Sequence, residues 1–277
     1  GGNMEALIDA DLVAYESASA AEMTEDGIRR NFDYVVQRVE DTIEFIVEYA
    51  GCSSYSLYIT GKDNFRHDIA TLKPYKGNRK KEKPFYLEAT RKLLEGMGAI
   101  VCDGMEADDM LAVEAKRREP ESFVICSRDK DLRMIPCWQY SWEVGNQPEW
   151  GPQLVDELGE LHVRRSTKIL KSGEQSNAIT KIWGTGLMWF YCQMITGDTT
   201  DNISGLEGKG AGLAYEILPP CKNEEELMRA VYAEYEKKYG ELAEERMLEQ
   251  GRLLWMHNEL DDEGKVILWE LPYGTVS

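Results

Sequence analysis

Acidic residues recur in short clusters whose composition suits the binding of metal ions. The clusters lie in the segments LIDADL, MEADDML, CSRDKDL and GDTTDN, and they contain Asp9, Asp11, Glu106, Asp108, Asp109, Asp129, Asp131, Asp198 and Asp201. Asp63 is a weaker, fifth candidate. Carboxylate ligands without histidine or cysteine favour Mg²⁺ or Mn²⁺ over zinc. Two such ions about 4 Å apart can activate a water molecule and stabilise the leaving oxygen of a phosphodiester. The clusters therefore predict a two-metal hydrolytic site.

Each cluster taken alone also has a simpler interpretation. Asp108 and Asp109 could complement the N-terminus of a helix, and aspartates near strand ends often make turns. The positions of the clusters favour the metal site, because three of them directly follow predicted strands. Ligand sites in parallel sheets gather beyond the carboxyl ends of the strands. Carboxylates brought together there repel one another by roughly 4 kcal/mol per close pair, unless cations compensate.

A basic run contrasts with these acids. The segment KPYKGNRKKEK from Lys73 to Lys83 is the densest positive stretch of the chain. Its possible nucleic-acid contacts are Tyr75, Lys76, Arg79, Lys80 and Lys81, since cations meet phosphates and aromatic rings stack on bases. Lys76 and Arg79 could also offset charge on a scissile phosphate. The alternative is a solvated charged loop.

A glycine-rich segment, GLEGKGAG, offers a second phosphate contact. Gly208 and Gly210, with Lys209 between them, allow a backbone to approach a phosphate closely. The segment follows a predicted loop and not a strand, which disfavours a dinucleotide site. A hairpin between helices that reads the DNA backbone without sequence preference fits it better.

The apolar pattern predicts an α/β fold with a mostly parallel central sheet flanked by helices. Strands are expected at Glu5–Ile8, Ser54–Thr60, Ala99–Cys102 and Ser122–Cys126, and helices at Phe32–Val47, Phe85–Gly96 and Asp108–Arg118. Strands that alternate with helices form parallel sheets covered on both faces. Beyond Trp142 the alternation ends.

The second half of the chain is expected to be largely helical. The segments HVRR, KILKSG and AITKIWG could form hairpins. Helices are expected at Leu187–Ile195, from Leu213, and within Glu224–Trp255, with a last strand at KVILWELP. We therefore predict three regions: an α/β core over 4–145, an irregular insert over 146–185, and a helical region over 186–277.

Composition places the chain among globular proteins. It has 277 residues and a net charge of −18, which opposes nucleic-acid binding unless cations neutralise the acids and positive charge collects locally. The sequence shows no apolar run that approaches a membrane span, and the expected location is the cytoplasm. The six cysteines form no CxxC pair and are expected to be reduced core thiols.

At this point the sequence resembles a known family. The segments EADDM, SRDKDL, YKGNR, FRH and GDTTDN-x-x-G-x-x-G-x-G are similar in order and spacing to motifs of the bacteriophage 5′→3′ exonuclease and flap endonuclease family. That family is related to the 5′-nuclease domain of bacterial DNA polymerase I. The resemblance runs from about Ala6 to Leu218, and the C-terminal QGRLLWMHNE looks like the end of short phage exonucleases.

The resemblance implies a fold, an activity and a set of ligands. It implies a PIN-like 5′-nuclease core with a helix–hairpin–helix-type C-terminal region that binds duplex DNA, often with K⁺. It implies a first metal at Asp9, Glu106, Asp108, Asp109, Asp129 and Asp131, and a second at Asp198 and Asp201. Lys76 and Arg79 would contact phosphate at the base of an arch. The implied substrates are DNA with 5′ ends or 5′ flaps, and RNA–DNA hybrids, and a monomer is expected.

One departure and two alternatives accompany this interpretation. The family often has an aspartate directly after its second strand, where this chain has Ile59, and Asp63 is the nearest acid that could replace it. Asp11 has no assigned role.

A phosphatase of the haloacid dehalogenase type would use the DAD and GDTTD segments but leave EADD and SRDKD without a role. A DNA-binding module without catalysis is the other alternative.

Overall fold

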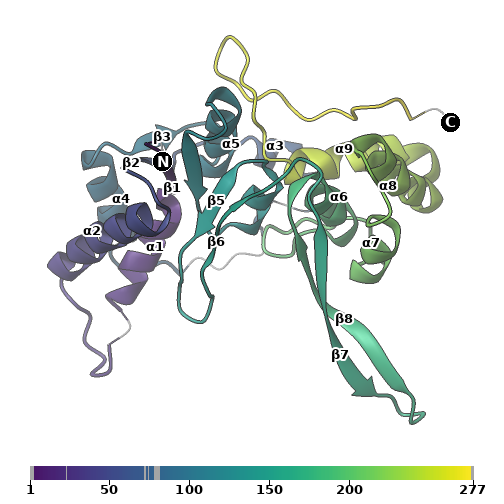
Figure 1. Ribbon diagram of the computed structural model, residues 1–277, viewed down its shortest axis with the longest axis horizontal. Helices are drawn as coiled ribbons and strands as arrows, with labels where there is room; N and C mark the ends of the chain where they lie inside the picture. The colour runs from purple at the N-terminus through teal and green to yellow at the C-terminus, as the bar shows by residue number, and fades with distance from the viewer. Residues whose placement is uncertain (1–2, 23, 72, 74, 78–81, 276–277) are drawn as a thin grey trace.

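A computed structural model gives the arrangement of residues 3–22, 24–71, 73, 75–77 and 82–275 (Figure 1). A six-stranded sheet with the order β3-β2-β1-β4-β5-β6 lies at its centre. The strands are β1 (Glu5–Asp9), β2 (Ser54–Thr60), β3 (Ile100–Cys102), β4 (Phe123–Cys126), β5 (Trp138–Ser141) and β6 (Trp150–Leu154). The first five are parallel, and only the edge strand β6 runs antiparallel to its neighbour β5. This confirms the predicted fold class.

Helices cover both faces of this sheet. On one face, Ala6 and Ile8 of β1 pack in a core with α1 (Ala10–Ala20), α2 (Phe32–Tyr49) and α4 (Leu87–Gly96). On the other face, Leu7 packs with α5 (Ala107–Arg117). Successive residues of a strand point to opposite faces, so one continuous apolar strand contributes to two cores.

The second core continues from the sheet into the helical half of the molecule. Its helices are α6 (Gly186–Thr196), α7 (Ala211–Ile217), α8 (Glu224–Tyr239) and α9 (Ala243–Leu254). Nearly every residue of α6 is buried, which matches its apolar sequence GLMWFYCQMIT. Short pieces complete the chain: α3 (Arg66–Ile69) and the 3₁₀ turns η1 (Lys130–Met134) and η2 (Gly240–Leu242).

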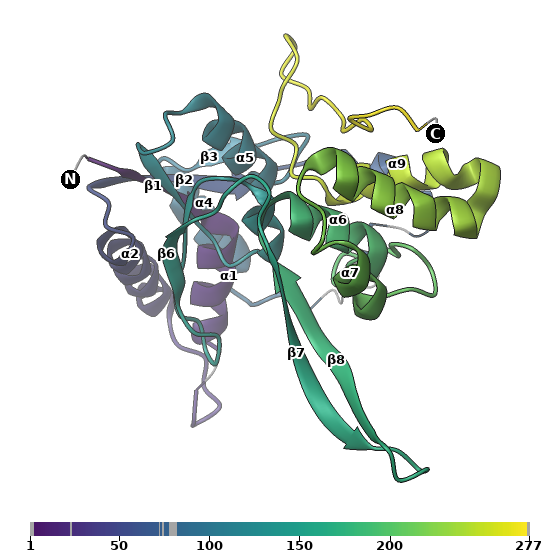
Figure 2. The same cartoon turned by 45° about the vertical axis from the view of Figure 1, so that its right-hand side comes forward.

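A long hairpin leaves the body between the sheet and the helical half. It consists of β7 (Leu161–Ile169) and β8 (Gln175–Gly184), which among the described strands pair only with each other (Figures 1 and 2). The turn lies within the expected KILKSG segment. Residues 146–185 thus hold the edge strand β6 and this hairpin.

The prediction of a last strand at KVILWELP is wrong. Only one isolated bridge, between Leu260 and Val266, forms in this segment. Trp269 instead packs against Gly251 of α9, and its backbone N–H donates to His257 Nε2 at 3.1 Å. The segment therefore packs against α9 and does not join a sheet as a strand. In the described part of the chain, no helix is long and apolar enough to cross a membrane.

Candidate metal centre

Acids from four separate segments meet at the carboxyl ends of the central strands. Asp9 ends β1, Asp129 and Asp131 follow β4, and Asp198 and Asp201 lie in the loop between α6 and α7. These five line one cavity of about 440 Å³. Asp108, in the first turn of α5, is buried beside Asp9 and Asp129, since both raise its pKa. The parallel topology thus brings together residues that are far apart in the sequence.

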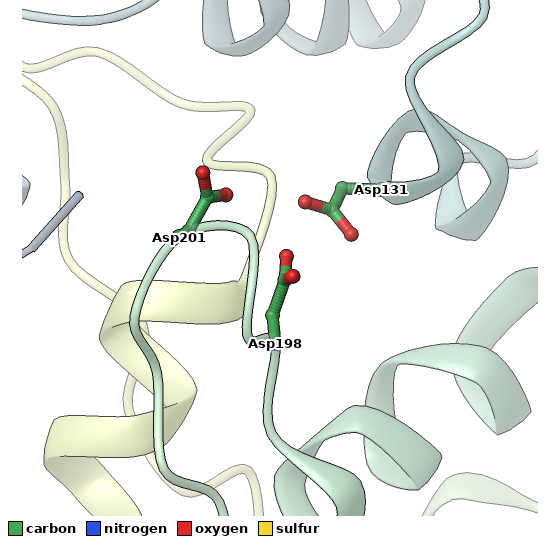
Figure 3. A group of neighbouring side chains, drawn as sticks. All are labelled: Asp131, Asp198 and Asp201. Carbon is green, nitrogen blue, oxygen red and sulfur yellow. The ribbon is translucent and has the colours of Figure 1, made fainter. Parts of the chain in front are cut away.

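Three of these carboxylates face one another closely. Asp131, Asp198 and Asp201 each offer an oxygen, and these oxygens all lie within 4.8 Å of one another. The side chains point toward a common centre from η1 and from the α6–α7 loop (Figure 3). Asp131 and Asp198 are buried. Lys130 Nζ lies 3.3 Å from Asp198 Oδ1 and supplies a partial counter-charge.

Two glycines fix the loop that carries Asp198 and Asp201. Gly197 and Gly205 both have positive φ, 70° and 66°. A Cβ on Gly205 would lie 2.3 Å from the backbone nitrogen of Gly197, so only glycine allows this approach. Asp198 and Ile203 exchange two backbone hydrogen bonds of 2.8 Å across the loop. The loop therefore presents its acids on a rigid frame.

Asp9 belongs to the other side of the same cavity. Its side chain accepts a hydrogen bond of 2.9 Å from the Ser127 hydroxyl, and it caps α1 by accepting from Leu12 N. Burial, with the charges of Asp11 and Asp129, raises the pKa of Asp9 to about 7. Burial and the neighbours Asp129 and Asp9 raise the pKa of Asp108 well above its usual range.

Asp131 and Asp201, on the other side of the cavity, also have raised pKa values. Burial and the charge of Asp129 raise the pKa of Asp131 well above its usual range. Burial and Asp198 raise the pKa of Asp201 to about 6. Without cations, several of these acids would hold protons near neutral pH. A divalent cation would replace those protons, because it favours the charged form of every neighbouring carboxylate.

Glu106 and Asp109 are held differently from Asp108. The buried Arg66 guanidinium donates to both oxygens of Asp109, at 2.6 and 2.7 Å, and lies 3.8 Å from Glu106. Burial alone would raise the pKa of Glu106, but Arg66 and Lys76 lower it to about 2. Both oxygens of Asp109 are thus engaged by arginine, and Glu106 lines a neighbouring cavity and not the one formed by Asp9 and Asp129.

The described part of the basic run lies against this neighbouring cavity. Lys76 Nζ is 2.6 Å from Glu106 Oε1, and its backbone N–H donates to the Asp201 carbonyl at 2.9 Å. The buried Tyr75 donates its hydroxyl to Glu106 at 2.9 Å, so its ring is not exposed for stacking on a base. Arg79, Lys80 and Lys81 lie outside the described residues.

Asp63 and Asp11 occupy separate positions. Asp63 is exposed, has a φ of 65°, and lines the neighbouring cavity with Lys76 and Glu106. Asp11 accepts hydrogen bonds from the backbone and hydroxyl of Thr60, at the end of β2, and from Arg91 of α4. It therefore ties β2 to two helices, a role that its spacing from Asp9 did not indicate.

The glycine-rich segment forms the turn that leads into α7. Gly208 has a φ of 80°, and Gly210 precedes the first residue of the helix. Lys209 lies between them with its side chain exposed. The segment thus has the expected place between two helices, α6 and α7.

Two polar residues that support the site had no role in the sequence analysis. Ser127 accepts from Asp129 N at 3.0 Å in addition to donating to Asp9. Gln193 donates to Asp131 Oδ1 at 2.6 Å from within α6. Gln193 is the one amide in the otherwise largely apolar run GLMWFYCQMIT, and that contrast was an available signal.

The donor set fits a hard divalent cation. The oxygens of Asp131, Asp198 and Asp201 are close enough to share one ion, and no histidine or cysteine lines the cavity among the described residues. Mg²⁺ and Mn²⁺ prefer such oxygen ligands and retain part of their water shell. Asp9, Asp108 and Asp129 form a second carboxylate group beside the first.

Solved structures share this architecture. A T5 5′-exonuclease with bound zinc ions superimposes with a TM-score of 0.56 over 91% of this chain and 89% of that one, at 16% identity. A bacteriophage T5 flap endonuclease complex with DNA and metal ions gives 0.57 over 92% and 89%, also at 16% identity. This chain has the T5 5′-exonuclease fold. The similarity confirms the predicted mainly parallel sheet flanked by helices.

Sequence comparison finds related segments in bacterial polymerases. DNA polymerase I of Geobacillus stearothermophilus is 25% identical over 238 residues, which are 83% of this chain and 25% of that protein. DNA polymerase I of Bacillus subtilis is 25% identical over 248 residues, 86% and 26% of the two chains. The chain thus spans about a quarter of the length of these relatives. No protein-family model matches it.

Proposed function

We propose that this protein is a divalent-metal-dependent 5′→3′ exonuclease and 5′-flap endonuclease that hydrolyses DNA. The observation that carries the proposal is the convergence of six carboxylates at the carboxyl ends of a parallel sheet. Such a site binds two hard cations, which can activate water and stabilise a leaving oxygen. The T5 5′-exonuclease fold supports the 5′ polarity of cleavage.

Two groups of acids would hold the ions. Asp131, Asp198 and Asp201 form one group, and Asp9, Asp108 and Asp129 form the other. Mg²⁺ or Mn²⁺ bound there would supply Lewis-acid activation of water. Glu106 and Asp109 lie beside these two groups of acids. We propose that they act through the cations with which they pair, Arg66 and Lys76. Asp63 lines the neighbouring cavity and is a ligand only if the loop that carries it shifts.

Lys76 is the proposed phosphate contact. Its ammonium pairs with Glu106 at the wall of the neighbouring cavity, where it can exchange that partner for a phosphate oxygen. The run Lys73–Lys83, including Arg79, Lys80 and Lys81, is proposed to continue this contact. Gly208, Lys209 and Gly210 are proposed to hold the backbone of the duplex before α7 and to bind K⁺ at that turn.

The proposed partners are duplex DNA with 5′ ends or 5′ flaps, and RNA–DNA hybrids. Residues 4–145 are proposed to form the catalytic core, and residues 186–277 are proposed to form the DNA-binding region. A monomer in the cytoplasm is proposed. The phosphatase alternative finds less support, because Asp11 is engaged by Thr60 and Arg91 and does not line the cavity of Asp9.

The test is a product ladder from 5′- and 3′-labelled duplex and flap substrates, with millimolar Mg²⁺ and with a chelator. We expect short products from the 5′ end in Mg²⁺ and none in chelator. Cleavage that begins at 3′ ends would contradict the polarity. Binding without any cleavage in Mg²⁺ or Mn²⁺ would instead indicate the non-catalytic DNA-binding module.

A further inference from the structure

The hairpin of β7 and β8, residues 161–184, is here called the basic arm. It projects from the body in both views (Figures 1 and 2). At about 3.3 Å per residue, strands of this length reach about 30 Å. Its only buried residues are Leu161 and Gly184 at its base. The arm therefore presents a long surface that the rest of the chain does not cover.

The charge of the arm is opposite to that of the protein. It carries five cations and one acid, Glu174. The cations are Arg164, Arg165, Lys168, Lys171 and Lys181. The rest of the chain then holds 27 of the 32 basic and 49 of the 50 acidic residues, a net charge of −22. None of the five forms a salt bridge with a carboxylate in the part of the chain that the structure describes.

The strand register places like charges against each other. Arg164 lies directly opposite Lys181, and His162 lies opposite Trp183 on the same face. Lys168 lies four residues further along β7, beyond a register shift between Arg164 and Arg165. Like charges directly opposite one another destabilise a hairpin, and an isolated two-stranded hairpin is marginally stable at best. An external anion along this face would relieve the repulsion.

The base of the arm adjoins the proposed DNA-binding turn. The Arg165 guanidinium lies 5.9 Å from the ring centroid of Tyr215 in α7. Arg165 and Tyr215 line a shared cavity of about 490 Å³ with Gly212. The positive surface of the arm thus starts beside the α6–α7 element and extends outward from it.

We propose that the basic arm binds the sugar–phosphate backbone of duplex DNA, as an extension of the contact made before α7. The inference rests on the proposed nuclease function. The reach of about 30 Å approaches one helical turn of duplex, about 34 Å. Phosphate contacts carry no sequence information, so the arm gives affinity and orientation on any sequence.

The test compares the triple variant Arg164→Gln/Lys168→Gln/Lys181→Gln with the wild-type chain. Binding of a labelled 30-base-pair duplex is measured by fluorescence anisotropy in chelator, at several salt concentrations. Each lost phosphate contact lowers the slope of log K against log salt by about 0.9. We expect the slope to fall by about two to three and the affinity at low salt to fall at least about tenfold.

A charge-matched control separates this effect from a change in net charge. Arg38→Gln/Lys116→Gln/Arg117→Gln removes three exposed cations of α2 and α5, outside the proposed DNA-binding region, whose side chains are 43%, 50% and 58% exposed. This control should bind duplex like the wild type. Equal losses in both triple variants would overturn the inference, as would an unchanged affinity of the arm variant.

A shortened arm gives an independent measurement. Residues 167–177 are replaced by Asn-Gly, which joins the paired residues Ser166 and Ala178 through a tight turn. This change removes two cations, Lys168 and Lys171, so the salt slope should fall by about two and the affinity should fall, with an unchanged melting temperature. If the wild-type chain cleaves and binds DNA but both arm variants bind equally well, the arm has no such role. If the wild-type chain neither binds nor cleaves DNA, the proposed function itself fails.

Discussion

Asp108 and Asp109 are neighbours in the sequence, and the structure gives them different environments. Asp109 is neutralised by a bidentate contact with Arg66, whereas Asp108 is buried among other acids. Both could be predicted as members of an acidic group at a strand end. The difference between their environments could not be predicted. It depends on Arg66, which lies in a different segment, and on the face of α5 that contacts Arg66.

Asp131 is the residue whose loss should separate catalysis from binding. Metal ions stabilise a transition state by several kcal/mol, so Asp131→Asn should slow cleavage at least about a hundredfold. Binding of duplex in chelator should be retained, because the variant removes a negative charge. Asp262→Asn, at an exposed position of the C-terminal segment, makes the same chemical change and should leave the rate unaltered. Normal digestion of 5′-labelled duplex by Asp131→Asn would show that the ligand assignment is wrong.

Arg66 has a structural effect that unfolding experiments can measure. Besides Asp109, it donates to the carbonyls of Leu253 and Trp255 at 2.9 Å, so it joins α5 to the end of α9. Removing one partner of a buried ion pair costs about 3–5 kcal/mol. Arg66→Met should lower the free energy of unfolding by that amount in urea titrations. The double variant with Asp109→Leu should lose less than the sum of the two single losses; strict additivity would contradict the coupling.

At the scale of elements, periodic apolar residues gave reliable predictions. The strands β1 to β4 and the helices α2, α4 and α5 lie within a few residues of their predicted positions. The helix α1 was not predicted because its sequence ADLVAYESASA has small residues and no clear apolar stripe. β5 was missed because it has only four residues, and β6 because it contains Gly151 and Pro152 and lies at the sheet edge. The strand predicted at KVILWELP failed because Trp269 is held by α9.

The contact between Trp269 and α9 leads to a prediction at this scale. A Cβ at Gly251 would lie 2.3 Å from the Trp269 ring, so Gly251→Ala must displace the C-terminal segment. Overpacking of this kind costs about 1–3 kcal/mol. We expect a lower melting temperature in calorimetry. Gly96→Ala, in α4 with open space around the new Cβ, should instead raise it, because alanine is the better helix former by about 1 kcal/mol. A rise in both variants would argue against the packed position of Trp269.

At the scale of the whole molecule, the acids of the metal centre oppose folding when no metal is present. The pKa of Asp9 is raised to about 7 and that of Asp201 to about 6, from ordinary values near 4. Between pH 4 and 7 the folded state therefore holds more protons than the unfolded state, and stability falls as the pH rises. Glu106, with a pKa lowered to about 2, acts in the opposite direction only below pH 4.5.

Melting temperatures measured from pH 5 to pH 8 test this balance. In chelator, the melting temperature should decline across that range as Asp9 and Asp201 lose their protons. In millimolar Mg²⁺ the decline should flatten or reverse, since the ion binds only the folded, deprotonated site. Asp9→Asn should weaken the pH dependence in chelator. A stability that rises with pH in chelator would contradict the raised pKa values.

The acids of the metal centre come from segments that span most of the chain, from Asp9 in β1 to Asp201 before α7. Asp198 and Asp201 join the acids of the sheet only when the helical half has docked, so the complete site is absent from an unfolded or half-folded chain. In kinetic terms, a bound ion should then act after the folding transition state. Mg²⁺ is expected to slow unfolding far more than it accelerates folding, and a charged active site of this kind would protect the finished protein without guiding its formation.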